Sequence, residues 1–433
     1  MSDLVIKGGH LLDPAAGLDA PKDILVRAGR VAEIAPPGKL KGISGIAVVD
    51  ASGLTVAPGL IDIHVHLREP GQAHKETIAT GTACAAAGGF TAVAAMPNTR
   101  PANDSPETTR WMLAPERGAQ VRVFPIAAAT RGMKGEAIND YAALKSAGAI
   151  AVSDDGLPIL KDGIMREALA AAARVGLPVI QHAEDTRMTQ GGSMNAGPAS
   201  FRLGLRGMPA EAETAIVERD IRLVSELRDS RVHLHVAHLS TAGALAAVRQ
   251  ARRNGLRVTC EVAPHHFLLT DEHVGFYNTN AKMCPPLRSA ADRDAMIEGI
   301  LDGVVDCIAT DHAPHARHEK EVEFQLAPNG ITGLETALGL SLYWLHKQAK
   351  LPLGRILTLL SAQPAALLGM KGRGTLSVGS FADVVVFDPK AEWTWKVSET
   401  LSKAQNSPFD GWTMLGRVHH TISEGRIAYS NPA

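Results

Sequence analysis

The amino-acid sequence predicts an α/β protein: a (β/α)₈ TIM barrel that carries a small β-sandwich domain formed by both ends of the chain. Eight short, β-rich apolar runs alternate with helical stretches across the middle of the chain, which is the pattern of a parallel barrel. Short strand-like runs separated by Gly and Pro occupy both ends. We therefore expect the barrel at residues 56–372 and the β domain at residues 1–55 and 373–433.

The two ends of the chain have similar patterns. The N-terminal part contains four short runs typical of antiparallel strands joined by turns, namely "DLVIKGG", "DILVRAG", "RVAEIAP" and "GIAVVDA". The C-terminal part continues the pattern in "GTLSVGSFADVVVFDP", "EWTWKV" and "RVHHTISEGRIAYS". These runs can pair across the two ends and build one domain beside the central unit.

The central segment supplies the eight barrel strands. We expect them at "LTVAPGLIDIHVH", "GFTAVAAMPN", "VRVFPIAAAT", "GAIAVSDD", "LPVIQHAED", "VHLHVAHLS", "LRVTCEVAPHH" and "VDCIATDHAPH". Two helical partners are clear, "IMREALAAAARVG" and "STAGALAAVRQARRNG". In the second, Ser240 is expected as the N-cap and Gly255 as the residue just after the helix. The active site of such a barrel forms where the strands end.

Composition and charge exclude several classes of protein. The 433 residues are 45% hydrophobic, and 44 Lys and Arg balance 45 Asp and Glu without a basic block, so we expect no nucleic-acid partner. The start "MSDLVIKGGH" lacks a signal-peptide pattern, and no apolar run approaches the roughly 18–20 residues that span a bilayer. We expect a cytoplasmic protein without a membrane partner. The four cysteines are scattered without a C-x-x-C pair, which favours reduced thiols: Cys84, Cys260, Cys284 and Cys307.

Histidines and aspartates cluster at the predicted strand ends. His64 and His66 lie two apart on one strand, so their side chains share a face, although such a pair alone is more often solvated than metal-binding. Five strand ends together change that interpretation, because imidazoles and carboxylates that converge from several strands are the composition of a zinc site with one or two ions. The other residues at these ends are Asp154, Asp155, His182, His238 and Asp311.

The motifs resemble the amidohydrolase superfamily and, within it, the bacterial class I dihydroorotases. The resemblance covers nearly the whole chain and rests on "GLIDIHVHLREPG", "AAMPNT", "SDDG", "QHAED", "HVAHLST", "TCEVAPHH", "NAKMCPPLR" and "ATDHAPH". It implies two Zn²⁺ ions, the first bound by His64, His66 and Asp311 and the second by His182 and His238. Asp155 and a hydroxide would bridge the ions. Many relatives use a carboxylated lysine as the bridge, but Lys145 and Lys161 do not occupy the matched position.

The resemblance also implies the substrate contacts. Arg68 would grip the substrate carboxylate, since a planar guanidinium suits a bidentate bond. The segment 312–330 would form a mobile loop that closes on the substrate. Further contacts are implied at His66, Asn98, Asn280, His315, Asn329 and Gly330. The chain departs from many relatives at Cys284, where they carry Asn or Ser, and in the length of "APN" before Gly330. Five more histidines we interpret as structural: His233, His235, His265, His266 and His312.

The implied activity is the reversible, zinc-dependent cyclisation of N-carbamoyl-L-aspartate to (S)-dihydroorotate plus water, a step of pyrimidine (UMP) biosynthesis. In the hydrolytic direction a hydroxide between the two ions attacks the ring amide, and Asp311 serves first as base and then as acid. Two alternatives stay open: a hydantoinase or allantoinase type of cyclic amidase, or a non-catalytic partner of aspartate transcarbamoylase. An active chain could also bind that transferase or form a homodimer, and the sequence decides neither.

Overall fold

The barrel is a sheet of eight parallel strands in sequential order. In the computed structural model, which describes residues 3–41 and 43–431, these strands are β6 (Leu60–Val65), β7 (Phe90–Ala95), β8 (Arg122–Ala128), β9 (Ala151–Ser153), β10 (Val179–Gln181), β13 (Leu234–Val236), β14 (Val258–Val262) and β15 (Cys307–Ile308). The sheet closes beyond β15, where the backbone N–H of His66 donates to the carbonyl of His312 at 2.9 Å. Each of the eight predicted runs contains one of these strands.

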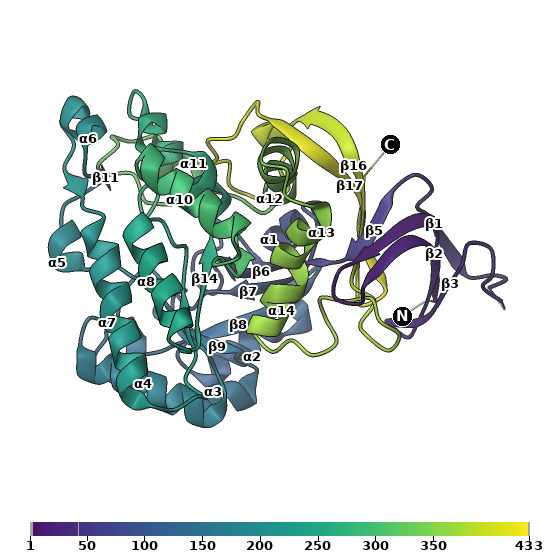
Figure 1. Ribbon diagram of the computed structural model, residues 1–433, viewed down its shortest axis with the longest axis horizontal. Coiled ribbons are helices and arrows are strands. Elements are labelled where there is room, and N and C mark those ends of the chain that lie inside the picture. The colour runs from purple at the N-terminus through teal and green to yellow at the C-terminus, as the bar shows by residue number, and fades with distance from the viewer. Residues whose placement is uncertain (1–2, 42, 432–433) are drawn as a thin grey trace.

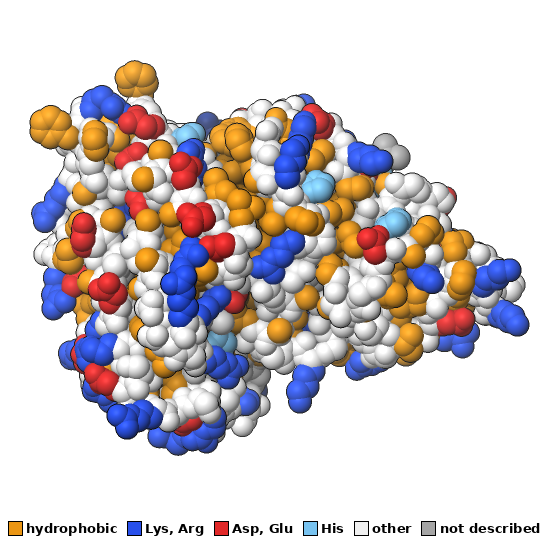
Figure 2. Space-filling view, in the orientation of Figure 1, with side chains coloured by type: hydrophobic (Ala, Val, Ile, Leu, Met, Phe, Trp, Pro, Cys, Tyr) orange, Lys and Arg blue, Asp and Glu red, His pale blue; other side chains and the backbone are white. Residues whose placement is uncertain are grey.

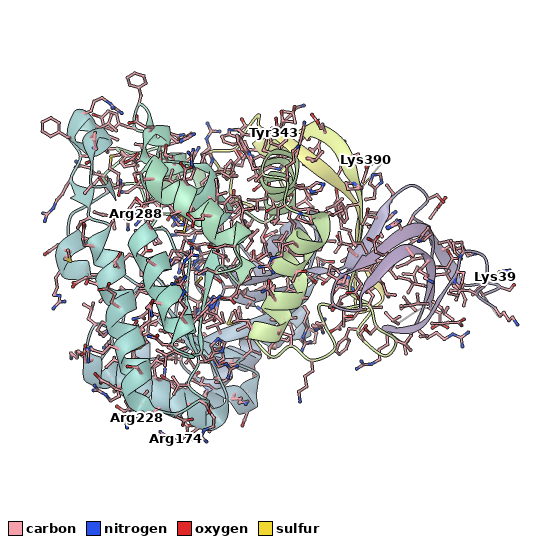
Figure 3. All side chains as sticks on the ribbon, in the orientation of Figure 1. Lys39, Arg174, Arg228, Arg288, Tyr343 and Lys390 are labelled. Atoms are coloured by element: carbon pink, nitrogen blue, oxygen red, sulfur yellow. The ribbon has the colours of Figure 1, made fainter. Side chains whose placement is uncertain are left out.

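Helices surround the sheet on its outer side (Figure 1). The larger ones are α1 (Ile78–Ala87), α2 (Pro106–Leu113), α3 (Tyr141–Ala147), α4 (Asp162–Val175), α7 (Glu211–Leu227), α8 (Ala242–Arg253) and α10 (Ala290–Leu301). On β7, Ala92 and Ala94 pack inside the barrel, while Val93 and Ala95 pack against the helices. Arg174 lies in the last turn of α4 and Arg228 just after α7, and both lie at the lower edge of the molecule in Figure 3.

The predicted ends of helix α8 are confirmed on one side only. Gly255 follows the C-cap with φ of 75°, the left-handed conformation that glycine adopts without strain. The N-cap is Thr241, whose side chain accepts from the backbone N–H of Ala244, so the prediction of Ser240 was wrong. Ser240 instead donates its hydroxyl to the buried carboxylate of Glu213, and this partner, 27 residues away, is not visible in the local sequence.

The last part of the barrel is a series of short helical pieces. They are α12 (Ala337–Ser341), η5 (Leu342–Gln348), α13 (Leu353–Leu357), η6 (Thr358–Ala362) and α14 (Gln363–Leu367), and they run between the barrel and the second sheet in Figure 1. Ala365, Leu368 and Met370 pack against the interior residues of the barrel strands. This end of the barrel is therefore closed by side chains, and a site can open only at the other end.

A second sheet contains strands from both ends of the chain, as predicted. Its path is β18 (Arg426–Ser430), β17 (Thr413–Ser423), β16 (Val384–Thr394), β5 (Thr55–Pro58), β1 (Leu4–Asp13), β2 (Leu18–Arg27) and β3 (Arg30–Ala35), with β4 (Ala47–Asp50) beside β1. Most pairs are antiparallel, and apolar side chains from both ends share one core. The purple and yellow strands lie together on one side of the barrel (Figure 1). The exact limits at residues 56 and 373 stay a prediction.

The surface carries charges of both signs. Figure 2 shows Lys and Arg interspersed with Asp and Glu over the helical face. In α7, Arg222 pairs with both Asp162 and Glu226. Within residues 3–41 and 43–431, no helix is long and apolar enough to cross a membrane.

Candidate metal centre and substrate pocket

Six buried side chains converge at the carboxyl ends of the barrel strands. Each lies on a barrel strand or follows one by no more than three residues, and each is at most 5% exposed. Strand β6 supplies two of them, and four other strands supply one each. This placement follows from the parallel sheet, whose strands all end at the same rim. The six are His64, His66, Asp155, His182, His238 and Asp311.

Asp155 lies at the centre of this cluster. Its Oδ1 is 3.4 Å from His64 Nε2, 3.4 Å from His238 Nε2 and 3.6 Å from His182 Nδ1. Its Oδ2 is 3.5 Å from His66 Nε2. One carboxylate therefore faces ring nitrogens of four histidines on opposite sides of the site, which is the position of a bridging ligand.

Asp311 approaches only one half of the cluster. Its Oδ1 lies 3.0 Å from His66 Nε2 and 3.5 Å from His64 Nε2. Burial would raise the pKa of this carboxyl group, but the neighbouring histidines outweigh burial and lower the pKa to about 2. Asp311 is therefore ionised at neutral pH and can accept a proton.

The donor atoms fit a cation. His64 Nε2 and Asp155 Oδ1 are buried without a hydrogen-bond partner among the described residues, and such orphaned atoms are costly unless something binds them. Two sets of three donors lie close enough to hold one ion each: His64, His66 and Asp311, and His64, Asp155 and His238. Imidazole and carboxylate donors at this spacing suit zinc.

The two aspartates of "SDDG" have different surroundings. Asp154 accepts hydrogen bonds from the backbone N–H of Thr130 at 2.9 Å and from its hydroxyl, on the side of the chain away from the cluster. Burial raises the pKa of Asp154 to about 6. Lys145 is equally remote, because its ammonium group donates to the carbonyl of Val175. Asp155 alone of the pair reaches the histidines.

Glu261 contacts two residues of the cluster, His64 and His238, and was not identified from the sequence. One of its oxygens contacts His64 Nδ1 and accepts from the backbone N–H of His238 at 3.2 Å, while the other lies 3.1 Å from His235 Nε2. This carboxylate fixes the tautomer of His64, so that Nε2 is the atom presented to the site. An acidic residue inside the buried run of "TCEVAP" was the signal available.

Three site residues have left-handed backbone conformations. Arg68, His238 and Asp311 have φ of 61°, 32° and 47°. Non-glycine residues rarely adopt such angles, which cost on the order of 1–3 kcal/mol each and cluster at functional sites. The surrounding barrel therefore holds these side chains in place against a local conformational cost.

A cavity of about 380 Å³ opens above the cluster, and most predicted substrate contacts line it. Its wall includes His66, Arg68, Asn98, Cys284, His315 and Asn329. Gly330 adjoins it, and an added Cβ there would lie 2.4 Å from the carbonyl oxygen of Ala313. Asn280 lies in the turn η4 (Thr279–Ala281) and does not line the cavity, whereas Cys284 does. The geometry therefore gives no support to Asn280 as a substrate contact.

Arg68 is the buried cation of this wall. Its Nε donates to the carbonyl of Pro314 at 3.1 Å, and its Nη2 is 3.2 Å from His315 Nε2. Burial lowers the pKa of Arg68 to about 10, so the group stays charged at neutral pH. Burial, followed by Arg68 and Lys75, lowers the pKa of His315 to about 2. His315 is therefore neutral, and its Nε2 also lies 2.9 Å from the carbonyl oxygen of Asn329.

The segment 312–330 is anchored by side chains from outside it. The Nδ2 of Asn406 donates to the carbonyls of Ala313 at 3.0 Å and Gly330 at 2.9 Å, while its Oδ1 accepts from the backbone N–H of His315 at 2.9 Å. Lys282 donates to the carbonyls at positions 325 and 327. Asn406 comes from the C-terminal part of the chain, which the sequence assigned only to the β domain. Closure of this segment on a substrate stays a prediction.

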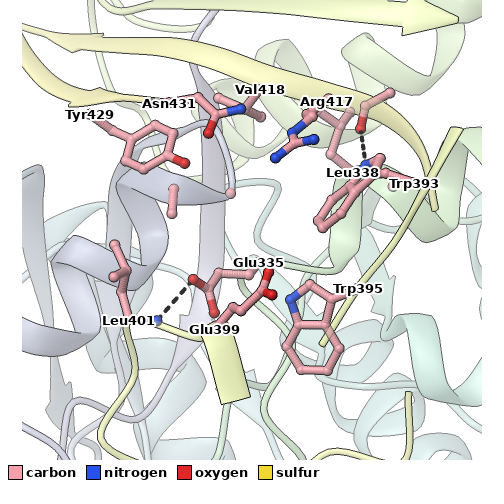
Figure 4. Close-up of a pocket in the computed structure, with 14 residues that line it drawn as sticks. Glu335, Leu338, Trp393, Trp395, Glu399, Leu401, Arg417, Val418, Tyr429 and Asn431 are labelled. Atoms are coloured by element: carbon pink, nitrogen blue, oxygen red, sulfur yellow. Dashed lines mark hydrogen bonds between the residues drawn. The ribbon is translucent and has the colours of Figure 1, made fainter. Parts of the chain in front are cut away.

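A second cavity, of about 370 Å³, lies between the barrel and the second sheet (Figure 4). Its walls include Trp393, Trp395 and Tyr429, together with the acidic residue Glu335. Glu335 accepts from the backbone N–H of Leu401 at 3.0 Å, as Figure 4 shows. No predicted site residue is among the described residues that line it, so the two cavities are separate.

A closed parallel barrel with buried histidines and carboxylates at its rim defines the amidohydrolase class of enzymes. Comparison with known proteins agrees: a family model described as "Dihydro-orotase-like" matches residues 53–244, and one described as "Amidohydrolase family" matches residues 285–429. Curated dihydroorotases from Citrifermentans bemidjiense and Geobacter metallireducens are each 49% identical, over 99% of both chains. The chain belongs to the dihydroorotase family and is a cyclic amide hydrolase.

Solved structures confirm the fold. An L-hydantoinase (dihydropyrimidinase) from Arthrobacter aurescens has a TM-score of 0.87 at 24% identity, covering 100% of this chain and 97% of that one. A D-hydantoinase from a Thermus species has a TM-score of 0.83 at 24% identity, covering 99% and 97%. At this level of identity the likeness concerns the architecture alone.

Proposed function

We propose that this enzyme interconverts N-carbamoyl-L-aspartate and (S)-dihydroorotate in the synthesis of pyrimidines. The observation that carries the proposal is the buried, charged guanidinium of Arg68 in the cavity wall, where its bonding partners are a carbonyl and a neutral imidazole. A buried charge is costly unless it is paired, so the cavity favours a substrate with a carboxylate. Both proposed compounds carry one beside the reacting amide.

Two zinc ions are the proposed cofactor. His64, His66 and Asp311 would hold one, His182 and His238 the other, and Asp155 would join them. When bound, the ions supply a Lewis acid for the amide carbonyl and a water acidic enough to lose its proton near neutral pH. The orphaned atoms of His64 and Asp155 support this assignment.

The protein's own residues then orient the substrate and move one proton. Arg68 binds the free carboxylate, and Asn98, His315 and Asn329 lie around the same cavity to fix the ring. Gly330 allows its backbone to pass close to Ala313 and His315, where a Cβ would clash. Asp311, ionised and directed at the cluster, accepts a proton as the amide is attacked and returns it to the leaving nitrogen. In cyclisation the same transfers run in reverse.

Turnover of dihydroorotate, hydantoin and allantoin separates this proposal from the other cyclic amidases. Hydantoin has no carboxylate for Arg68, so we expect dihydroorotate to be preferred by at least about 100-fold in kcat/KM, the order of a lost charged hydrogen bond of about 3 kcal/mol. Faster turnover of hydantoin or allantoin would assign the enzyme to that class. No turnover of any of them by zinc-loaded protein would favour a non-catalytic partner of aspartate transcarbamoylase.

The bridging role of Asp155 can be tested by reconstitution. Apoprotein should bind two zinc ions per chain and regain full activity without added bicarbonate, because an aspartate bridge needs no carbon dioxide. A bicarbonate requirement would instead indicate a carboxylated lysine. Sedimentation of the zinc enzyme, alone and mixed with aspartate transcarbamoylase, tests the proposed homodimer and the proposed complex.

A further inference from the structure

His182 presents two different faces to its surroundings. Its Nδ1 is directed at the six-residue cluster, 3.6 Å from Asp155 Oδ1 and 2.8 Å from His238 Nε2. Its Nε2 is directed the opposite way, 3.0 Å from Glu184 Oε2 and 3.9 Å from Cys284 Sγ. Cys284 Sγ is itself 3.3 Å from Glu184 Oε2. An imidazole nitrogen, a carboxylate oxygen and a sulfur thus form a triangle outside the cluster.

The triangle has nearly the dimensions of a metal site. For tetrahedral zinc, bonds of about 2.3 Å to sulfur and about 2.0 Å to nitrogen and oxygen place S and N, or S and O, about 3.5 Å apart and N and O about 3.3 Å apart. The three separations observed here are 3.9, 3.3 and 3.0 Å. Shifts of less than about 0.5 Å would therefore bring all three donors to a single ion.

The site is accessible and anchored. Glu184 and Cys284 are half-buried and line the same cavity as Arg68, so an ion can enter by the route of the substrate. The other oxygen of Glu184 accepts from the hydroxyl of Thr189, which orients the carboxylate. A thiolate beside an imidazole selects soft and borderline cations such as Cd²⁺ and Zn²⁺ over Mg²⁺ or Ca²⁺.

We propose that His182 Nε2, Glu184 and Cys284 form a further cation site, which takes a thiophilic divalent cation and obstructs the substrate pocket. Binding forms a bond from the ion to each residue. It releases one proton from the thiol and one from Nε2 of His182 to solvent, while the hydrogen bond between His182 and Glu184 is replaced. The obstruction of the pocket rests on the proposed function, whereas the binding of the ion does not.

The test is a titration of the zinc enzyme with cadmium chloride. Cadmium bound to a thiolate absorbs in the near ultraviolet, and the histidines and carboxylates of the six-residue cluster give no such band. We expect the band to rise with one added cadmium per chain, as counted by metal analysis after gel filtration. Cys284→Ser should abolish both the band and the added ion, and Glu184→Gln should weaken cadmium binding at least tenfold.

Cys307→Ala is the matched control, because Cys307 lies in the one other described donor set that contains a thiol. That set joins it to His235 and Glu261 in the closed interior of the barrel. The band should persist in Cys307→Ala. A band that survives Cys284→Ser, or that only Cys307→Ala removes, would overturn the proposal.

The consequence for catalysis is measured separately. For each protein we compare the apparent KM for dihydroorotate with cadmium, at the concentration that saturates the band, to the KM without cadmium. This ratio should be larger in the wild type than in Cys284→Ser. An unchanged KM would refute the obstruction of the pocket. A band without turnover of dihydroorotate by any variant would leave the cation site standing and refute the proposed function instead.

Discussion

Replacing Asn406 with Asp exchanges one NH₂ group for an oxygen at the point where the C-terminal part of the chain meets the segment 312–330. The two amide hydrogen bonds to the carbonyls of Ala313 and Gly330 are lost, while the bond from the backbone N–H of His315 can persist. The carbonyl of Ala313 then has no donor among the described residues, at about 1–3 kcal/mol, while that of Gly330 keeps the ammonium group of Lys320 at 3.2 Å and loses one hydrogen bond of about 0.5–1.5 kcal/mol. The ordered segment is therefore destabilised by about 1.5–4.5 kcal/mol, before the cost of placing an anion beside two carbonyl oxygens is added.

This loss should appear in substrate binding and not in metal binding. Since every 1.4 kcal/mol is tenfold, we expect KM for dihydroorotate to rise by at least about tenfold in Asn406→Asp, with zinc content unchanged and with faster proteolysis within 312–330. Asn139→Asp is the matched control, because Asn139 is also buried and donates to one carbonyl, that of Ala128, away from this segment. A wild-type KM and wild-type protease resistance in Asn406→Asp would refute the anchoring role.

Four further predictions concern the site. Arg68→Met should keep both metals but lower kcat/KM for dihydroorotate by about 2–5 kcal/mol, roughly 30- to 4000-fold, and near wild-type kinetics would remove Arg68 from the site. Asp155→Ala should lose at least the second metal and nearly all turnover, whereas Asp154→Ala should be milder because that side chain bonds Thr130; equal metal loss in both would contradict this. His315→Ala should depress turnover at unchanged metal content, and ligand should protect the 312–330 segment of the wild type from proteolysis; equal cleavage with and without ligand would argue against closure. Burial and a neighbouring lysine lower the pKa of Lys320 to about 7, so between about pH 7 and 10.4 the unfolded chain binds more protons than the folded protein and stability rises with pH. The free energy of unfolding in urea should therefore rise from pH 7 to 9 by about 2 kcal/mol more in the wild type than in Lys320→Met, and parallel pH profiles would refute the shift.

Periodicity was sufficient to predict the architecture. The eight barrel strands are short and continuously apolar because they are buried on both faces, and such runs stand out between helices with one polar face. The cap of α8 was wrong by one residue because Ser240 and Thr241 are both good N-caps. The choice between them depends on the carboxylate of Glu213, which contacts both and lies on another helix.

The convergence of the six residues could be predicted because each lies on a recognisable strand or follows one closely. The residues that support them could not, because their partners are distant in the chain. Glu261 contacts His64 across 197 positions, and Asn406 contacts Ala313 across 93. Asn280 was assigned as a substrate contact only through the family resemblance, whereas in this chain Asn280 lies in the turn η4 and Cys284, not Asn280, lines the cavity.

The pairing of β5 with β16 has a consequence for the protein while it is being synthesised. Pro58 lies opposite Val384, so β5 cannot pair with β16 until about 325 more residues have been synthesised. At translation rates of about 5–20 residues per second, that edge stays unpaired for about 16–65 s. An open strand edge is a template for wrong pairing with another chain. The nascent N-terminal strands thus expose this edge to wrong pairing throughout that interval, and slow translation would prolong the exposure.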